Sequence, residues 1–470
     1  MSFHATSNID ASIFRAYDIR GKVESQLTPD AVYTIGLALG TEMHQMGKKE
    51  IVIGRDGRLS GPILIQALRQ GLMDSGADVL DIGILPSPVL YFASHYIPMD
   101  CAVILTGSHN PSEYNGLKMI LGGVTLAEGR IQALYQHTQK QDFFYATGTY
   151  RQDEKLIEQY IDFIAQQIQL PRSLKIVVDC GNGVAGCVAP TLFSRLGCEV
   201  VQLYCEVDGN FPNHHPDPSV AENLEDLIIA VKKHQADLGL AFDGDADRVG
   251  VITSSGHIIW PDRLMMLFAK DILSRHPGGK IVFDVKCSYH LPAIIEAHHG
   301  VPIMCPTGHS LVKSKMKAVD ALIAGELSGH IFFKENWFGF DDGLYSACRL
   351  LDILAKQSLS LDALFADIPD SVNTPEIKIS LADDQKFAFV EHLKQAGQFG
   401  QAKIIDIDGI RVEFEDGWGL LRASNTTPCL VARFEANNAE ALKRIQFLFK
   451  EQLNTVNKSF KTPQVLEIPF

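Results

Sequence analysis

The sequence lacks long apolar runs, and it also lacks paired cysteine motifs. No uninterrupted apolar stretch reaches the length that a membrane-spanning helix needs. The first ten residues contain neither the basic nor the apolar region of a signal peptide. The nine cysteines are scattered without CxxC spacing, which disfavours a zinc site or a disulfide framework. We therefore expect a cytoplasmic protein whose thiols are reduced.

The sequence contains fewer basic than acidic residues. The chain has 42 Lys and Arg against 56 Asp and Glu, which leaves a formal net charge of −14. Such a surface argues against nucleic acid and anionic membranes as main partners. An anionic small molecule could bind only where cations are gathered locally. Arg and Lys residues inside glycine-containing loops are therefore candidates for function.

The length and the apolar pattern indicate several α/β domains. A chain of 470 residues is too long for one core. Apolar strands separated by helical stretches recur in three successive units, each with three strands. The first strands are 50–54, 175–179 and 280–284, the second begin at 76, 197 and 300, and the third are 102–105, 238–242 and 321–324. Continuous apolar strands alternating with amphipathic helices predict three similar α/β domains with mainly parallel sheets.

The pattern changes from about residue 373. A helix over 384–395, a helix over 438–453 and short strands at 403–407, 410–414, 418–422 and 429–435 predict a smaller α+β domain. The predicted domains are residues 1–155, 156–257, 258–371 and 372–470. The tail from about residue 455 has no clear pattern, and we expect it to be loosely held.

A chemically rich loop follows the third strand of each unit. These loops read Thr-Gly-Ser-His-Asn-Pro at 106–111, Asp-Gly-Asp-Ala-Asp-Arg at 243–248 and Gly-Glu-Leu-Ser-Gly-His at 325–330. Loops at the carboxyl ends of parallel strands commonly build ligand sites. Three equivalent loops therefore predict three domains that face one cleft.

The second loop has three aspartates at alternate positions. In extended backbone Asp243, Asp245 and Asp247 would point the same way, and three like charges favour a bound cation. Carboxylate oxygens suit Mg²⁺. A calcium-binding EF-hand is disfavoured because Arg248 takes the sixth loop position and Ser254 the twelfth. An acidic turn is the simpler alternative. Arg248 could clamp a phosphate or merely neutralise the aspartates.

Ser108 in the first loop could carry a phosphoryl group. A serine hydroxyl can do so when it reaches a metal and lies among cations, and His109 and Lys118 are close in sequence. The flanks of Ser108 do not match the G-x-S-x-G elbow of serine hydrolases. Taken alone, Ser108 would more often cap a helix or lie in a turn. Its place in the triple repeat favours the covalent role.

The remaining loops offer groups that bind sugars and phosphates. Glu326 and Ser328 could hydrogen-bond to sugar hydroxyls, although a plain turn is the simpler explanation of this loop taken alone. The segment Arg-Ala-Ser-Asn-Thr-Thr at 422–427 could hold a phosphate that is not transferred, or it could be an ordinary polar hairpin. Further cations near strand ends are Arg20, Lys286 and His309.

These motifs, together with Phe-Arg-Ala-Tyr-Asp-Ile-Arg-Gly at 14–21, are the basis of a resemblance. The chain resembles the α-D-phosphohexomutase superfamily, and within it the bacterial phosphomannomutase/phosphoglucomutase group, over essentially its whole length. The resemblance implies three tandem α/β domains and a C-terminal α+β domain around a central cleft. It also implies one Mg²⁺ per chain, with a hexose 1,6-bisphosphate as intermediate and activator. Small-molecule hexose phosphates are the expected partners, without nucleic acid or membrane, and a monomer is favoured.

The resemblance also suggests a role for individual residues. The catalytic candidates are Ser108, as a phosphoserine, Arg20, His109, Lys118 and Arg248. The candidates for substrate binding are Tyr17, Lys286, His309, Glu326, Ser328, Arg422, Ser424, Asn425 and Thr426. The metal candidates are Asp243, Asp245 and Asp247, with Ser108 as a further ligand through its phosphate.

The implied activity is phosphoryl transfer between the 1- and 6-positions of mannose phosphate and of glucose phosphate. Leu327 and Asn425 depart from the pattern of the phosphoglucosamine mutase branch, which is the first alternative. A sugar phosphatase that uses the same serine is the second. It would not need a fixed phosphate clamp such as the Arg422 loop. A sugar-phosphate sensor without activity is disfavoured because Ser108 and the three aspartates are intact.

Overall fold

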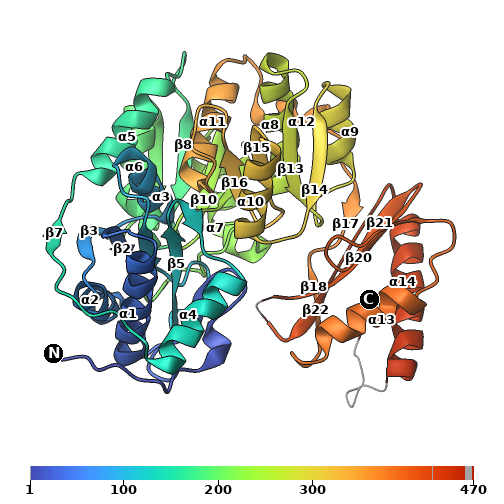
Figure 1. The fold of residues 1–470 in the computed structure, drawn as a ribbon. Helices are drawn as coiled ribbons and strands as arrows, with labels where there is room; N and C mark the ends of the chain where they lie inside the picture. Colours follow the sequence, from blue (N-terminus) through green and yellow to red (C-terminus); the bar gives the residue numbers. More distant parts are fainter. Residues whose placement is uncertain (1, 426, 461–467) are drawn as a thin grey trace. The chain divides into compact units, whose positions relative to one another are not determined.

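The computed structural model describes residues 2–425, 427–460 and 468–470, and Figure 1 traces its helices and strands along the chain. Two compact units are present, Met1–Leu264 with Leu322–Phe365 and Met265–Ala321 with Ala366–Phe470. Among the residues described, no helix is both long and apolar enough to cross a membrane.

The first sheet has the order β1-β5-β4-β2-β3-β7, and β6 pairs with β5. Its strands are β1 (Ile19–Lys22), β2 (Glu50–Arg55), β3 (Asp78–Ile84), β4 (Ala102–Leu105), β5 (Tyr114–Leu121), β6 (Val124–Thr125) and β7 (Tyr150–Gln152). Its helices are η1 (Ala11–Ile13), α1 (Pro29–Gln45), α2 (Gly61–Asp74), α3 (Ser87–Tyr96) and α4 (Gly129–Lys140). Strands β3, β2 and β4 are parallel, and β5 runs antiparallel to β4.

Helices α1 and α2 cover part of this sheet and pack closely together. The α1 helix begins where the Thr28 hydroxyl accepts a hydrogen bond from the Ala31 backbone N–H, with Pro29 as its first residue. A side chain at Gly71 of α2 would lie 2.1 Å from the Tyr33 carbonyl oxygen, so only glycine permits this approach. The buried core includes Leu37 and Leu68 from the helices and several strand residues, namely Ile51, Ile53, Val103, Leu105 and Leu117.

The second sheet has the order β12-β11-β10-β8-β9. Its strands are β8 (Lys175–Asp179), β9 (Glu199–Leu203), β10 (Leu238–Phe242), β11 (Val249–Thr253) and β12 (Ile258–Ile259). The helices of this region are α5 (Leu156–Gln167), η2 (Val184–Cys187), α6 (Ala189–Arg195), η3 (Ala221–Leu224) and α7 (Glu225–His234). Strands β9, β8 and β10 are parallel, and β11 is antiparallel to β10. Leu227 and Val231 of α7 pack on Val177 and Ile252 of the sheet.

The third α/β segment contributes elements to both units. Strands β13 (Lys280–Asp284) and β14 (Val301–Cys305) form a parallel pair, and β15 (Ile323–Gly325) and β16 (Ile331–Phe333) form an antiparallel pair. The helices of this segment are α8 (Pro261–Arg275), α9 (His290–Ala297), α10 (His309–Val319), α11 (Gly343–Ala355) and α12 (Leu361–Ala366).

The C-terminal domain is a sheet covered by two helices. The strand order is β17-β22-β21-β20-β19, and β18 pairs with β22. The strands are β17 (Val372–Asn373), β18 (Ile377–Ser380), β19 (Lys403–Ile405), β20 (Ile410–Phe414), β21 (Gly417–Ala423) and β22 (Cys429–Ala436). Helices α13 (Lys386–Ala396) and α14 (Ala439–Phe460) bury Phe389, Ile445 and Phe449 against Val412 and Phe434. The predicted α+β architecture of this region is thereby confirmed.

The strand predictions are confirmed for the first strands of all three repeats and for the third strands of the first two, whereas the third strand of the last repeat begins at Ile323, two residues later than predicted. The second strands start one or two residues late, at Asp78, Glu199 and Val301. In the first two repeats the reason is a left-handed glycine, Gly76 or Gly197, which turns the chain before the strand begins.

The tail prediction is wrong for residues 455–460, because α14 continues to Phe460. The four domain limits stay predictions.

The structure adds a feature to the repeat that the sequence did not indicate. Each third strand is followed by an antiparallel neighbour, giving the pairs β4–β5, β10–β11 and β15–β16. The three predicted loops connect the two strands of these pairs. The functional loops are therefore ββ connections, held at both ends by ladder hydrogen bonds, rather than strand-to-helix connections.

Candidate active site

The three repeated loops meet within the first compact unit. The Ser108 hydroxyl donates a hydrogen bond to Oδ2 of Asp243, at 2.9 Å. Arg248 at the end of the second loop forms an isolated β-bridge with His330 at the end of the third. The Arg248 Nε lies 3.3 Å from Nε2 of His330. The structure thus brings together side chains that are more than 200 residues apart in the sequence.

Ser108 is buried in an uncommon backbone conformation. Its side chain is 2% exposed, and its φ of +48° lies in the left-handed region that non-glycine residues seldom adopt. Its N–H donates to the Thr106 hydroxyl at 2.8 Å, and its Oγ lies 3.1 Å from Nδ1 of His109. The surrounding contacts therefore hold the hydroxyl in one direction, toward Asp243.

Arg58 fixes the backbone of the Ser108 loop, and sequence analysis did not identify it. Its Nη2 donates to the carbonyl oxygens of Ser108 and Asn110, at 2.8 and 2.5 Å. Its Nη1 donates to two further carbonyls, those of Pro111 and Tyr114, at 2.6 and 2.8 Å. Asp56 completes the support, since its Oδ2 accepts from Arg58 Nε, Thr106 Oγ1 and the Gly107 N–H. Both residues follow the end of strand β2. Their position at a strand end is the only feature of the sequence that could have indicated a role in the site.

Replacing Arg58 with lysine should destabilise the protein and slow its reaction. One ammonium group cannot reach four carbonyl oxygens, of which that of Ser108 is buried and the other three are partly buried. We expect a loss of about 3 kcal/mol in the free energy of unfolding, from denaturant titration, together with lower activity. Arg69→Lys is the control, because that guanidinium lies over the Tyr150 ring, away from the loop. Equal stability of the two variants would contradict the assigned role.

The three aspartates converge, as predicted, but through a turn. Asp243, Asp245 and Asp247 are fully buried, and each offers a carboxylate oxygen within 4.8 Å of the others. The predicted reason, an extended backbone, is wrong. Ala246 has a φ of +61°, and its N–H donates to the Asp243 carbonyl at 3.1 Å. A side chain at Gly244 would lie 2.3 Å from the Ser108 carbonyl oxygen, so glycine is needed where the two loops touch.

Lys118 on β5 lies among the aspartates. Its Nζ is 2.6 Å from Oδ2 of Asp245 and 2.5 Å from Oδ2 of Asp247. Burial acts to lower the pKa of Lys118, but Asp245 and Asp247 outweigh it and hold this pKa well above its ordinary value. Lys118 is therefore a permanent cation in this site.

The aspartates are not equivalent. Burial, followed by the charges of Asp247 and Asp245, raises the pKa of Asp243 well above its ordinary value. Asp247 is also buried, but Lys118 and His330 hold its pKa well below its ordinary value. Asp245 is held at Oδ2 by Lys118 and by the Ser87 hydroxyl, at 2.5 Å, whereas its buried Oδ1 has no hydrogen-bond donor. An unpaired carboxylate oxygen beside two other acids is a fitting ligand for a divalent cation.

The third loop is organised around His330, a residue to which sequence analysis assigned no role. His330 Nδ1 lies 2.9 Å from the Ser328 hydroxyl and 3.2 Å from Oε2 of Glu326, and Nε2 lies 3.3 Å from Oδ1 of Asp247. Burial lowers its pKa, but Asp247 outweighs this effect and the pKa of His330 is raised to about 9. The imidazolium therefore links the predicted sugar-binding residues to the aspartate loop.

The first domain supplies the other candidates. Arg20 donates to the Asn110 side chain at 2.8 Å and pairs with Asp18 at 2.5 Å, which places it beside the Ser108 loop. His109 is half-buried. Loss of solvent around the ring, followed by the charges of Arg248 and Arg20, lowers its pKa well below the ordinary value. His109 is therefore neutral. Tyr17 lies half-buried on the segment before β1, three residues from Arg20.

The second compact unit contains the remaining candidates. Asp408 accepts from Arg422 Nε at 2.9 Å and from the Thr307 N–H at 3.0 Å, so it ties the Arg422 strand to the turn before His309. Lys286 Nζ lies 3.0 Å from Oε1 of Glu376. Burial would raise the pKa of Glu376, but Lys286 and Arg422 hold it below its ordinary value.

Within this unit two of the phosphate-binding candidates, Arg422 and Lys286, are each paired with a carboxylate, Asp408 and Glu376. Lys286, His309, Arg422 and Ser424 are buried, and Asn425 is half-buried. Thr426, which the sequence also assigned to substrate binding, lies outside the described residues.

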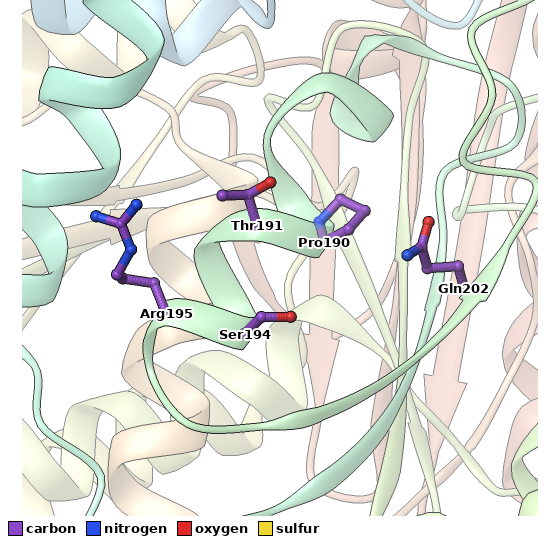
Figure 2. A pocket seen from close by; sticks show the side chains of 5 residues that line it. All are labelled: Pro190, Thr191, Ser194, Arg195 and Gln202. Carbon is purple, nitrogen blue, oxygen red and sulfur yellow. The ribbon is translucent and has the colours of Figure 1, made fainter.

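A separate hollow lies on the second sheet of the first unit (Figure 2). It has a volume of about 620 Å³ and is lined by Pro190, Thr191, Ser194 and Arg195 of α6 and by Gln202 of β9. Arg195 is already engaged by Glu158 and Asp162. The hollow contains none of the residues that the sequence singled out, and it offers no uncommitted cation for a phosphate.

Family models cover nearly the whole chain. Those for phosphoglucomutase/phosphomannomutase α/β/α domains I, II and III match residues 11–144, 158–256 and 260–372, and the model for the C-terminal domain matches 376–451. These matches confirm the predicted fold class of three α/β domains followed by a C-terminal domain.

Individual proteins are similar over nearly the full length. Phosphomannomutase/phosphoglucomutase of Pseudomonas aeruginosa is 53% identical, covering 98% of this chain and 100% of its own. Phosphoglucomutase of Neisseria gonorrhoeae is 52% identical, covering 94% and 97%. A crystal structure of a phosphoglucomutase/phosphomannomutase family protein from Burkholderia thailandensis has a TM-score of 0.92 at 46% identity, covering 98% and 100%.

A more distant structure shares the fold alone. It is Aspergillus fumigatus N-acetylphosphoglucosamine mutase in complex with GlcNAc-6P and magnesium, with a TM-score of 0.54 at 15% identity, covering 88% of this chain and 85% of its own. The family resemblance seen in the motifs is confirmed by the domain matches and by the full-length relatives. The chain belongs to the phosphoglucomutase/phosphomannomutase family.

Proposed function

We propose that the protein moves a phosphoryl group between O1 and O6 of mannose phosphate and glucose phosphate through a phosphoserine at Ser108. The observation that carries this proposal is the Ser108 hydroxyl, buried and 2.9 Å from Asp243, inside a cluster that also contains Asp245, Asp247 and Lys118. A hydroxyl so placed can be phosphorylated beside groups that offset the charge of the phosphate.

The first step transfers the phosphoryl group from Ser108 to the free hydroxyl of the bound sugar phosphate. The bond from phosphorus to Ser108 Oγ breaks as the bond to the sugar oxygen forms, the proton of the sugar hydroxyl passes to Ser108 Oγ, and a hexose 1,6-bisphosphate results. In the return step Ser108 Oγ attacks the other phosphate and loses its proton. The proton passes to the sugar oxygen that leaves. Two groups contact Ser108 Oγ and can relay it, Asp243 Oδ2, which accepts from the hydroxyl at 2.9 Å, and Nδ1 of His109, at 3.1 Å.

Cations of the same unit would stabilise the transferring group. Lys118 is held beside the aspartates, Arg248 follows them, and Arg20 is anchored to Asn110 beside Ser108. Charge on the three equatorial oxygens is greatest in the transition state, so fixed cations there lower the barrier.

The aspartate cluster fits Mg²⁺. Asp243, Asp245 and Asp247 would hold the ion, with a phosphate oxygen on Ser108 as a further ligand, and Asp245 Oδ1 and Asp247 Oδ1 are buried without a hydrogen-bond donor. When bound, the ion would polarise the phosphoryl oxygens. The magnesium complex of the Aspergillus enzyme supports this choice of metal. A hexose 1,6-bisphosphate would serve as activator, since it can phosphorylate an unmodified Ser108.

Substrate recognition is divided between two sets of residues. Glu326 and Ser328, positioned by His330, would bind the sugar hydroxyls O3 and O4, which mannose and glucose share. Tyr17, Lys286, His309 and the 422–426 loop would bind the remainder of the substrate, with Arg422 on the phosphate that is not transferred. Mannose and glucose differ only at C2, so an enzyme that does not contact O2 accepts both.

Product analysis tests the proposed function. Mannose 1-phosphate or glucose 1-phosphate is incubated with the protein, Mg²⁺ and a trace of the matching 1,6-bisphosphate. We expect the 6-phosphate to form without inorganic phosphate. Inorganic phosphate without 6-phosphate would establish a phosphatase instead, and a higher kcat/KM on glucosamine 1-phosphate would favour the phosphoglucosamine branch.

Replacing Arg422 with lysine should weaken substrate binding more than turnover. Lysine keeps the charge but cannot form the two parallel N–H hydrogen bonds that a guanidinium donates to a phosphate. We expect KM for glucose 1-phosphate to rise by about 10- to 100-fold while kcat changes little, because the lost contact is with a phosphate that does not react. Arg444→Lys, an exposed arginine of the same domain paired with Asp416, is the control. An unchanged KM in the Arg422 variant would remove this residue from the substrate site.

A further inference from the structure

Cys180 and Cys205 form a thiol pair at the ends of two neighbouring strands. Cys180 directly follows β8, and Cys205 lies two residues beyond β9. The parallel ladder pairs Asp179 with Leu203, and the Cys180 N–H donates to the Leu203 carbonyl at 3.1 Å. The two sulfur atoms lie 3.4 Å apart. Both thiols are free, and the sheet itself fixes their spacing.

The two cysteines differ in accessibility and acidity. Cys180 is fully buried, whereas Cys205 is partly exposed. A hydrogen bond from the Cys180 thiol lowers the pKa of Cys205, and burial raises the pKa of Cys180 well above its ordinary value. Since the thiolate is the reactive form, Cys205 is the one to meet an oxidant and Cys180 is placed to react with it afterwards.

We propose that Cys180 and Cys205 form a reversible oxidative modification site that responds to small peroxides. The Cys205 thiolate attacks one peroxide oxygen, the O–O bond breaks, and hydroxide leaves, which gives a sulfenic acid on Cys205. The Cys180 sulfur then attacks the Cys205 sulfur, an S–S bond forms, and water leaves with the proton from Cys180. With hydrogen peroxide the balance is two thiols and one peroxide to one disulfide and two waters.

The geometry requires little movement to form the bond. A disulfide has an S–S distance of about 2.05 Å, so the sulfur atoms must approach by about 1.4 Å. Rotation of the partly exposed Cys205 side chain can supply part of this movement. The remaining movement must come from the tightly packed backbone at Cys180.

A movement of Cys180 would reach the aspartate loop. The Cys180 carbonyl accepts from the Gly183 N–H at 2.7 Å, and the next residue, Val184, donates to the Gly244 carbonyl at 3.1 Å. Gly183 packs so closely that a side chain there would lie 2.9 Å from that carbonyl oxygen. Gly244 stands between two of the aspartates. We therefore expect oxidation to disturb the aspartate cluster and lower activity, an effect that rests on the proposed function.

Peptide mapping tests formation of the disulfide directly. The reduced full-length protein is treated with hydrogen peroxide, free thiols are blocked with N-ethylmaleimide, and digested peptides are analysed by mass spectrometry. We expect a Cys180–Cys205 linked peptide that disappears after dithiothreitol. Cys187→Ser is the matched control, because Cys187 is a partly exposed thiol of the same domain, and it should still form the link. Absence of the linked peptide, or a disulfide involving Cys187 instead, would overturn the proposal.

Activity after oxidation tests the coupling to the aspartates. We expect the wild-type protein to lose mutase activity in proportion to the linked peptide and to regain it with dithiothreitol, whereas Cys205→Ser should keep its activity under the same treatment. Equal loss in both proteins would overturn the coupling. Failure of the proposed function is distinguishable, because untreated protein would then produce no 6-phosphate while the linked peptide still formed.

Discussion

Ser108→Ala should lower mutase activity by about 10⁴-fold or more, the scale expected when a covalent nucleophile is removed. Alanine lacks the oxygen that carries the phosphoryl group between the two ends of the sugar. Two other hydroxyls near the site are engaged elsewhere, because Thr106 Oγ1 donates to Asp56 and Ser87 Oγ donates to Asp245. The measurement is kcat/KM on glucose 1-phosphate in the presence of Mg²⁺ and a trace of glucose 1,6-bisphosphate.

The fold of this variant should survive, which separates chemistry from structure. The Ser108 hydroxyl donates one hydrogen bond, to Asp243. The bonds by which Arg58 and Asp56 support the loop do not involve this hydroxyl, so they remain in the alanine variant. Ser94→Ala is the matched control, since that hydroxyl donates to the Tyr91 carbonyl within α3 and should keep full activity. Incubation with ³²P-labelled bisphosphate should label the wild type and not Ser108→Ala. Near-full activity or undiminished labelling in Ser108→Ala would exclude Ser108 as the phosphoryl carrier.

Asp245→Asn should lower activity by about 10³-fold, which corresponds to about 4 kcal/mol of transition-state stabilisation. The asparagine keeps the size of the side chain but removes one of the three charges that would hold the cation. Asp245 Oδ1 is one of the buried carboxylate oxygens without a donor, whereas Oδ2 accepts from Lys118 and Ser87. The asparagine can keep its oxygen at the Oδ2 position, so the replacement should alter metal binding more than internal hydrogen bonding. The metal-free protein should lose little stability, because Lys118 keeps its ion pair with Asp247.

Thermal unfolding with and without Mg²⁺ provides a readout independent of catalysis. Binding to the native state raises Tm as the ligand concentration exceeds Kd. We expect Mg²⁺ to raise the Tm of the wild type and to have a much smaller effect on Asp245→Asn. Asp179→Asn is the matched control: it is equally buried at the end of β8, but it accepts from His214 and lies outside the aspartate cluster. An equal shift in Asp245→Asn and the wild type would place the metal elsewhere.

Several parts of the site could be predicted from the sequence because they depend on local patterns of apolar and polar residues. The third strand of each repeat is a continuous apolar run, and the residues after it are polar, so the loops containing Ser108, Asp243 and Glu326 stood out. The predicted meeting of these loops is correct within the first unit. The shape of the aspartate loop was not predicted, because an alanine at position 246 does not indicate the left-handed backbone that it adopts there.

Other parts were missed because their role depends on distant partners. Arg58 is one arginine among many in the sequence, and only the folded chain shows it bound to the Ser108 loop some 50 residues away. Ser87 begins α3 and reaches Asp245 across 158 positions. His330 was visible inside its motif, but its place between Glu326 and Asp247 required both loops to be in position.

The sequence by itself determined the α/β repeat, the C-terminal domain, the family and the residue types of the chemistry, because each rests on periodicity or on motifs contiguous in the chain. The tertiary structure alone decided which side chains meet, since the contacts of Ser108, Lys118 and His330 join strands far apart in sequence. It also decided their electrostatic state. A carboxylate or imidazole has an ordinary pKa in the unfolded chain. In the folded chain neighbouring charges outweigh the effect of burial, so that the pKa of His330 is raised and that of Asp247 is lowered.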